Sequence, residues 1–156
     1  MARTVFVLGA GASTEGGAPV MNDFLDTAED LLRQKRVGKA TEDFELVLRA
    51  RDSLQAVHSK AVLNVRNLES VFGAFEMGRM LRRCGSLDIK DIDKLRTAIR
   101  SMITTTLEQS LDFRPQERRV LPPRPYDEFV TLVTDAQESP AADVAVITFN
   151  YDVALD

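Results

Sequence analysis

The spacing of hydrophobic residues changes along this chain, and each change predicts a different kind of element. A short apolar run, Val5–Leu8, stops at a glycine-rich turn and is typical of a strand. From residue 21 to residue 107, apolar residues recur on one helical face, which predicts amphipathic helices. These helices are expected to begin near Met21, Thr41, Leu68 and Asp88. In the third, Asn67 is a candidate cap, and the expected buried residues are Leu68, Val71, Phe72 and Phe75.

The pattern becomes irregular after the fourth helix. Four of the six prolines fall between Arg114 and Pro125 and predict an irregular loop. A short helix with Tyr126 and Phe129 is expected to follow. The segment Val144–Phe149 is a continuous apolar run that is rich in β-branched residues. Such runs suit a strand that is covered on both faces of a parallel sheet.

Two strands separated by helices predict an α/β fold, a Rossmann-like parallel sheet that carries a large helical insert. We expect residues 1–20 to form the first strand and the glycine turn, residues 21–137 the insert, and residues 143–156 the second strand. Sheets usually have four or more strands, so two strands leave open edges that invite pairing with another chain. The chain also stops at Asp156, where a helix should begin. We therefore expect it to be the truncated, N-terminal part of one larger domain.

Composition and charge argue against several kinds of partner and site. The formal net charge of −4 gives no general attraction to nucleic acid or membranes. The arginines near residue 118 are mixed with acidic residues, which favours a solvated loop of mixed charge over a binding surface. The single cysteine, Cys84, excludes an internal disulfide and a four-cysteine zinc site. We see no secretory signal and no apolar stretch of about 18 residues. We therefore expect a cytoplasmic protein without a metal and without a membrane or nucleic-acid partner.

The candidate chemistry lies in the turn after the first strand, Gly9-Ala10-Gly11-Ala12-Ser13. Glycine lets a phosphate approach the main chain without a Cβ in the way, and a helix that starts just beyond would offer free N–H donors. The alternative is a tight turn without a ligand. Thr14 replaces the third glycine of the dinucleotide fingerprint, and no second strand follows within about 30 residues. An ordinary hydride-transferring dehydrogenase therefore fits poorly.

Two motifs together resemble the sirtuin-like superfamily. Residues 9–19, Gly-Ala-Gly-Ala-Ser-Thr-Glu-Gly-Gly-Ala-Pro, match its nucleotide loop without a gap. Residues 148–152, Thr-Phe-Asn-Tyr-Asp, are similar to its Thr-x-Asn-x-Asp motif and closer still to that of bacterial sirtuin-like domains used in antiphage defence. Each motif follows a predicted strand, at the edge where open α/β sheets bind ligands. The resemblance covers these two blocks, with a loose match at residues 67–69.

The resemblance implies a sirtuin-type fold and a pocket for NAD⁺. The implied NAD⁺-binding residues are Gly9, Ala10, Gly11, Ala12, Ser13, Pro19, Thr148, Asn150 and Asp152. Asn150 and Asp152 are also the implied catalytic residues. By this resemblance, Asn150 would hold the nicotinamide ribose and orient the attacking water or acyl oxygen, and Asp152 would contact the carboxamide. Oxygen groups placed there in advance stabilise the positive charge that develops on the ribose.

Departures from the family pattern favour NAD⁺ hydrolysis to nicotinamide and ADP-ribose over protein deacylation. Deacylases carry Asp-Phe-Arg or a close variant after the proline, where this chain has Val20, Met21 and Asn22. The four zinc cysteines of deacylases have no counterpart here. The family's catalytic histidine lies downstream of the Asn-x-Asp motif, and His58 does not align with it. We therefore expect the 156-residue chain by itself to be inactive.

Two other functions remain open from the sequence. One is a module that binds NAD⁺ or an ADP-ribose relative without cleaving it. The other is a helical fragment that mediates oligomerisation, since Phe72, Phe75 and Met80 could form an interface. Whichever function holds, we expect homo-oligomers that associate through the helical insert.

Overall fold

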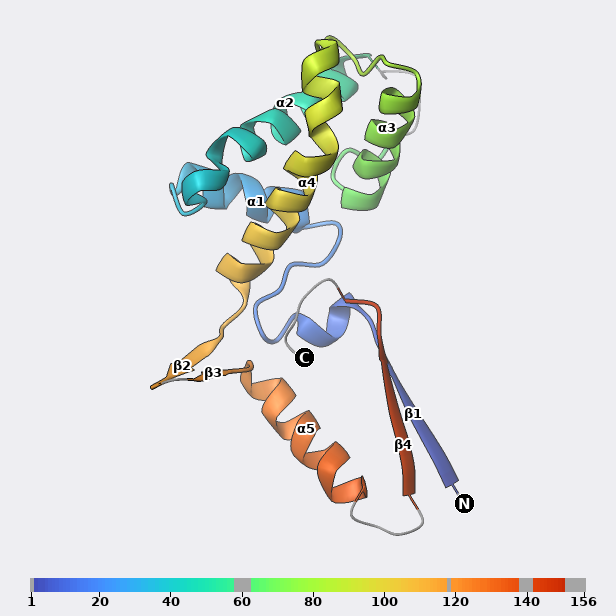
Figure 1. Cartoon of the computed structure of the whole chain (residues 1–156), viewed down its shortest axis with the longest axis vertical. Coiled ribbons are helices and arrows are strands. Elements are labelled where there is room, and N and C mark those ends of the chain that lie inside the picture. Colours follow the sequence, from blue (N-terminus) through green and yellow to red (C-terminus); the bar gives the residue numbers. More distant parts are fainter. Residues whose placement is uncertain (1, 58–62, 118, 138–141, 151–156) are drawn as a thin grey trace. The chain divides into compact units, whose positions relative to one another are not determined.

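The computed structural model describes residues 2–57, 63–117, 119–137 and 142–150. Its contacts gather into two units. The strand unit comprises Met1–Val20 and Ser110–Asp156, and the helical unit comprises Met21–Gln109. Figure 1 shows helices in the second unit and a pair of strands with a helix in the first. The described chain is therefore mixed α/β, as its hydrophobic pattern predicts.

The described part of the helical unit contains four α-helices. They are α1 (Phe24–Arg33), α2 (Thr41–Val57), α3 (Leu68–Met80) and α4 (Ile89–Ser110), and a short 3-10 helix, η2 (Gly38–Ala40), precedes α2. The predicted starts of the last three α-helices are confirmed to within one residue. Asn67 caps α3 as expected, because its Oδ1 accepts the Ser70 N–H at 3.0 Å. The first helix begins later than Met21, because residues 21–23 form a turn.

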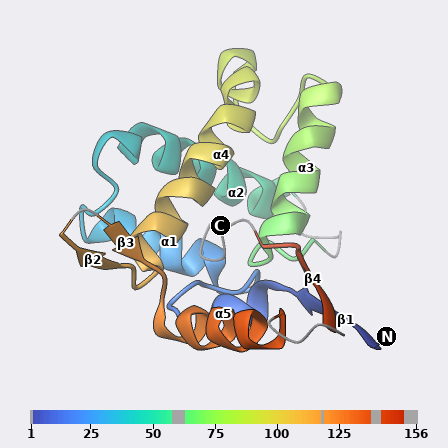
Figure 2. The same cartoon turned by 60° about the horizontal axis from the view of Figure 1, so that its bottom comes forward.

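The helical unit buries one face of each helix. Its buried residues include Phe24, Leu25, Ala28, Phe44, Val47, Val71, Phe75, Ile92, Leu95, Ile99 and Met102. Figure 2 shows α4 with α2 behind it and α3 to its side. At the rim, Arg49 of α2 pairs with Asp91 of α4 at 2.9 Å, and Arg96 of α4 lies 3.6 Å from Glu76 of α3. These helices therefore share one apolar core, with ion pairs at its edge.

One residue of α3 departs from the predicted pattern. Phe72 is 37% exposed, whereas Leu68, Val71 and Phe75 are buried as predicted. Residues three and four apart share a helix face, and Phe72 is turned by about 100° from Val71. The exposed apolar side chains of α3 include Phe72 and Met80, while Phe75 lies in the core. The expectation that Phe75 contributes to an oligomer interface is therefore wrong.

The strand unit is built on two parallel strands, β1 (Ala2–Leu8) and β4 (Ala142–Thr148), which pair along their whole length. Both predicted strands are confirmed, and each begins earlier than predicted. Helix α5 (Arg124–Gln137) packs on one face of this sheet. There the rings of Phe6 and Phe129 meet edge to face, with their centroids 5.2 Å apart.

The opposite face of the sheet is exposed. Val5, Val7 and Ile147 are 54%, 63% and 47% exposed, and the register places Ile147 beside Val7. Alternate side chains of a strand point to opposite faces, and α5 packs against only one of them. The prediction that the second strand is covered on both faces is therefore wrong within the described chain, where the parallel sheet has two strands.

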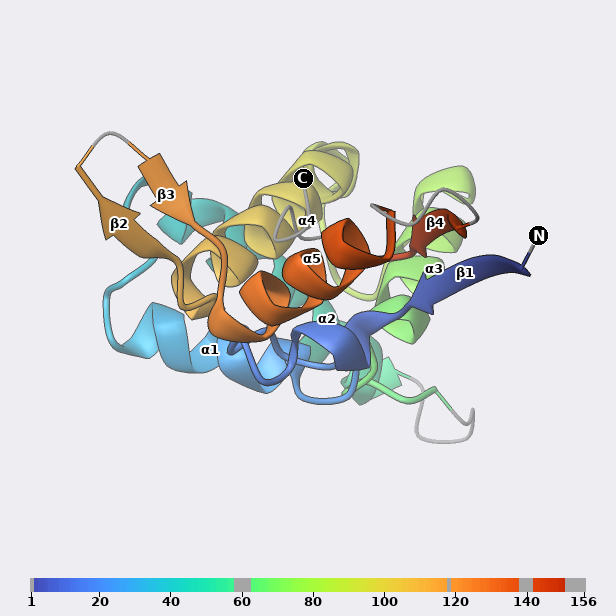
Figure 3. The ribbon, with the colours of Figure 1, turned by 90° about the horizontal axis from the view of Figure 1, so that it is seen from below.

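A small hairpin replaces the irregular loop that was expected between residues 114 and 125. Its strands, β2 (Arg114–Gln116) and β3 (Arg119–Leu121), pair antiparallel, and Figure 3 shows them from below. Pro115 can sit in β2 because an edge strand does not need every N–H for pairing. The hairpin and α5 belong to the strand unit, so the helical insert of the structure spans residues 21–109.

Candidate functional site

The glycine-rich turn lies directly after β1. Residues Ala10–Ser13 form a single 3-10 turn, η1, and Gly9 precedes it in an extended conformation. The next α-helix begins only at Phe24. The expectation that an α-helix starts just beyond the turn and supplies free N–H donors is therefore wrong. Its physical reason is local, because the Thr14 hydroxyl bonds back to the Gly11 carbonyl at 2.8 Å and further turns follow.

Gly9 and Gly11 have no structural need to be glycine in the described chain. Neither residue has a positive φ, and a Cβ built on either would meet no heavy atom within 4 Å. Their Cα atoms therefore border open space beside the main chain of the turn. Such a surface lets a phosphate group approach the backbone without a side chain in between.

Gly16 and Gly17, by contrast, are required by the fold. A Cβ on Gly16 would lie 2.9 Å from Cβ of Pro123, so glycine lets this loop pack against the segment that leads into α5. Gly17 has a φ of 95°, and a Cβ there would lie 2.3 Å from the Ser110 carbonyl oxygen. These two close approaches fix the loop against both ends of the hairpin segment.

Three polar side chains from distant parts of the strand unit meet beside this loop. The hydroxyl oxygens of Ser13 and Tyr126 lie 2.7 Å apart. The Asn150 side chain donates from Nδ2 to Ser13 Oγ at 3.0 Å and to Tyr126 OH at 3.4 Å. Ser13 is fully buried and Tyr126 is 3% exposed. The fold therefore joins the end of η1, the first turn of α5 and the end of β4 in one hydrogen-bonded cluster.

Asn150 also presents an acceptor that the protein does not use. Its Oδ1 is buried and has no hydrogen-bond partner among the described residues. The main chain around it is fixed, because the Asn150 N–H donates to Thr148 Oγ1 at 3.2 Å and the Phe149 N–H donates to the Leu8 carbonyl at 3.0 Å. An unsatisfied buried acceptor costs about 1–3 kcal/mol. A ligand that donates a hydrogen bond to this oxygen would recover that free energy.

The positions of the other predicted site residues say less about a ligand. Ala10, Ala12 and Pro19 are half-buried along the loop, and Thr148 is exposed at the end of β4. Asp152 lies outside the described residues, and so does His58. The structure thus brings together Ser13 and Asn150 from the two motifs.

Tyr126 is the member of the cluster that sequence reasoning missed. The sequence identifies it only as an apolar position of a short helix. A buried tyrosine hydroxyl usually finds a polar partner, which was the available signal. Its partners, Ser13 and Asn150, lie 113 and 24 residues away, and such distant partners are set by the fold.

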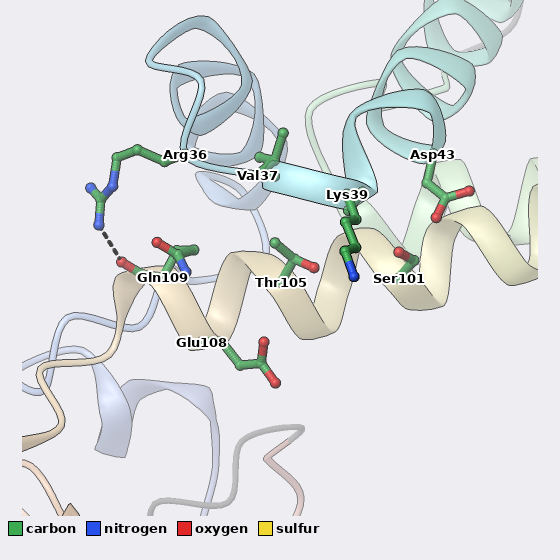
Figure 4. Close-up of a pocket in the computed structure, with 10 residues that line it drawn as sticks. Arg36, Val37, Lys39, Asp43, Ser101, Thr105, Glu108 and Gln109 are labelled. Atoms are coloured by element: carbon green, nitrogen blue, oxygen red, sulfur yellow. Dashed lines mark hydrogen bonds between the residues drawn. The ribbon is translucent and has the colours of Figure 1, made fainter.

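A separate groove of about 530 Å³ lies on the helical unit. Figure 4 shows Lys39 of η2 reaching over α4 near Thr105. The charges of Arg36 and Lys39 are balanced there by Asp43 and Glu108, so the groove has no excess charge with which to select an anion. It contains none of the predicted site residues and is not the candidate site.

The described residues include no group of three or more His, Cys, Asp or Glu side chains that could hold a metal ion. None of the helices described is long and apolar enough to cross a membrane. Comparisons with models of protein families, with curated proteins and with solved structures find no match. The function must therefore be inferred from the residues of the site and from its two motifs.

Proposed function

We propose that this chain belongs to an enzyme that hydrolyses NAD⁺ to nicotinamide and ADP-ribose. The observation that carries the proposal is the meeting of Ser13 and Asn150 beyond the ends of β1 and β4, close to the open glycines of the same loop. Ligands of open α/β sheets bind at this edge. The likeness of residues 148–152 to bacterial sirtuin-like domains favours a role in antiphage defence.

The loop supports binding of the diphosphate of NAD⁺. A phosphate needs N–H or hydroxyl donors and a close approach to the chain. Gly9 and Gly11 leave that approach open, and the close packing of Gly16 and Gly17 holds the loop in place. The first two glycines therefore keep the backbone of the loop accessible to a phosphate, and the other two hold that backbone in place.

Asn150 supports the chemistry at the ribose. Cleavage of the bond between nicotinamide and ribose develops positive charge on the sugar. Oδ1 of Asn150, which has no partner among the described residues, can accept a hydrogen bond from a ribose hydroxyl or from the attacking water. Because Ser13 and Tyr126 already hold the Nδ2 end of the amide, the acceptor needs little reorganisation during the reaction.

The test is turnover of NAD⁺ by the protein at its full natural length. We expect nicotinamide release, measured by chromatography, and no turnover of an acyl-lysine peptide. Asn150→Ala should lower kcat by about 100-fold or more and should change the NAD⁺ dissociation constant, measured by calorimetry, by less than about threefold. The reason is that the contact of Asn150 strengthens as charge develops on the ribose.

Asn64→Ala is the matched control. Asn64 is an exposed asparagine of the helical unit whose Oδ1 accepts only the nearby Arg66 N–H in the described structure, so this variant should keep the wild-type kcat. Binding of NAD⁺ without release of nicotinamide would overturn the proposal in favour of a sensor module. Acyl-lysine turnover would also contradict it.

A further inference from the structure

We propose that Tyr126 is a positioning residue of this site, which fixes the orientation of the Asn150 amide so that Oδ1 faces the ligand. The proposal rests on the proposed function for the identity of the substrate, an NAD⁺-type nucleotide. A ribose hydroxyl of that nucleotide, or the water that attacks it, would donate to Oδ1. The orientation of the amide itself is a property of the protein alone.

The structure places the donor end of the Asn150 amide against two hydroxyl groups. An asparagine amide has one end that donates and one that accepts, and the two have nearly the same shape. Ser13 Oγ and Tyr126 OH lie 2.7 Å apart, and both lie within 3.4 Å of Nδ2. One of these hydroxyls donates to the other and both oxygens can accept from Nδ2, while Oδ1 has no hydrogen-bond partner among the described residues.

Tyr126 is itself held firmly at the start of α5. Its main-chain N–H donates to the Pro123 carbonyl at 3.0 Å, and Pro123 packs against Gly16. The guanidinium of Arg114 donates to the Pro122 carbonyl at 2.8 Å and pairs with the Asp127 carboxylate. The hairpin thus anchors the first turn of α5, and with it the ring that carries the hydroxyl.

The consequence for the reaction follows from geometry. Without the tyrosine hydroxyl, Ser13 Oγ would be the one acceptor left for Nδ2 among the described residues, and the amide could rotate away from the orientation that presents Oδ1. A small misplacement of a catalytic group can cost about 100-fold in rate. NAD⁺ binding should depend less on this orientation, because the diphosphate is proposed to lie against Gly9 and Gly11 and not against Asn150.

The first test is kinetic and uses the protein at its full natural length. Tyr126→Phe keeps the buried ring and removes one hydroxyl. We expect kcat to fall about 10- to 100-fold while KM for NAD⁺ stays within about threefold. In the Asn150→Ala background the same change should have no further effect on kcat, because Tyr126 acts through Asn150. Equal falls in the two backgrounds would overturn the proposal.

Thr131→Val is the matched control for this test. It removes a hydroxyl from the same helix, but the Thr131 hydroxyl donates only to the Asp127 carbonyl of α5 in the described structure. Its kcat should equal that of the wild type. If Tyr126→Phe does not fold, Ser13→Ala tests the same orientation from the other hydroxyl and should also lower kcat.

The second test does not depend on turnover. The side-chain amide signals of Asn150 are identified in nitrogen-15 spectra by their loss in Asn150→Asp. Tyr126→Phe should shift these signals and speed their exchange with water, and Thr131→Val should leave them unchanged. Unchanged Asn150 signals in Tyr126→Phe would overturn the proposal. Altered signals in a protein that does not cleave NAD⁺ would uphold the positioning role and refute the proposed hydrolysis, so the two failures are distinguishable.

Discussion

At the scale of single residues, the loop after β1 contains two kinds of glycine. The fold requires glycine at some of its positions, and a ligand could require glycine at the others. Gly16 and Gly17 have no room for a Cβ, whereas a Cβ on Gly9 or Gly11 would meet no heavy atom of the described residues within 4 Å. A glycine without a structural role is conformationally costly, because it loses more freedom on folding than other residues. The two open glycines are therefore the better markers of a binding surface.

Gly11→Val should weaken NAD⁺ binding and leave the fold intact. A Cβ at residue 11 would meet no heavy atom of the described residues within 4 Å, so the melting temperature should stay within about 2 °C of the wild type. The valine side chain would block the approach of the diphosphate, and the dissociation constant from calorimetry should rise at least about tenfold. Gly73→Val is the control, since Gly73 of α3 is equally open. Unchanged affinity in Gly11→Val would show that the diphosphate binds elsewhere.

Cys84 gives a prediction that concerns pH. Burial raises the pKa of the Cys84 thiol above its usual range. The unfolded chain therefore loses this proton at a lower pH than the folded chain does. The stability from the protonated thiol is complete below the unfolded pKa of about 8.5 and is lost as the pH rises through the folded pKa.

The stability difference between wild type and Cys84→Ala should therefore shrink as the pH rises from 7 to 10. This stability difference should fall by at most about 1.4 kcal/mol for each pH unit, because one proton is involved. Urea unfolding at several pH values measures it. Cys84→Ser also lacks a titrating thiol in this range, and its difference from the wild type should shrink in parallel. A constant difference would show that the thiol titrates alike in both states.

At the scale of elements, the sequence was a good guide wherever periodicity decides the structure. α2, α3 and α4 begin where the apolar spacing places them, because each buries one face against the others. Asn67 caps α3 because its side chain can satisfy a local N–H, which needs no knowledge of the rest of the fold. Both strands were likewise visible as apolar runs.

Elements that depend on distant partners were not predictable in the same way. The β2–β3 hairpin forms in a proline-rich segment, stabilised by Arg114 contacts with Pro122 and Asp127. Local spacing gives no sign of these contacts. The exposed face of the sheet was also missed, since an apolar run in the sequence does not show which element covers it.

The site was half predictable for the same reason. Ser13 and Asn150 each follow a strand, and neighbouring parallel strands bring such ends together. Tyr126 enters through α5, whose packing depends on the close contact of Gly16 with Pro123. The spacing of apolar residues in the sequence does not reveal tertiary contacts of this kind.

At the scale of the whole molecule, the chain divides into two units of different character. The strand unit contains the site residues Ser13, Tyr126 and Asn150, and its sheet keeps one apolar face exposed. The helical unit, Met21–Gln109, holds most of the buried apolar side chains in four helices of the described chain. A unit with its own core can in principle fold alone.

We therefore expect residues 21–109, expressed as a separate fragment, to show a helical circular dichroism spectrum and a cooperative thermal transition. Phe44 is fully buried in this unit, so Phe44→Ala should lower the fragment's free energy of unfolding by about 3–5 kcal/mol. Phe72→Ala removes the same side chain from a partly exposed position of α3 and should cost much less. A fragment that stays helical but melts without cooperativity would show that its core needs the strand unit. Equal costs of the two substitutions would show that the fragment does not pack as it does in the chain.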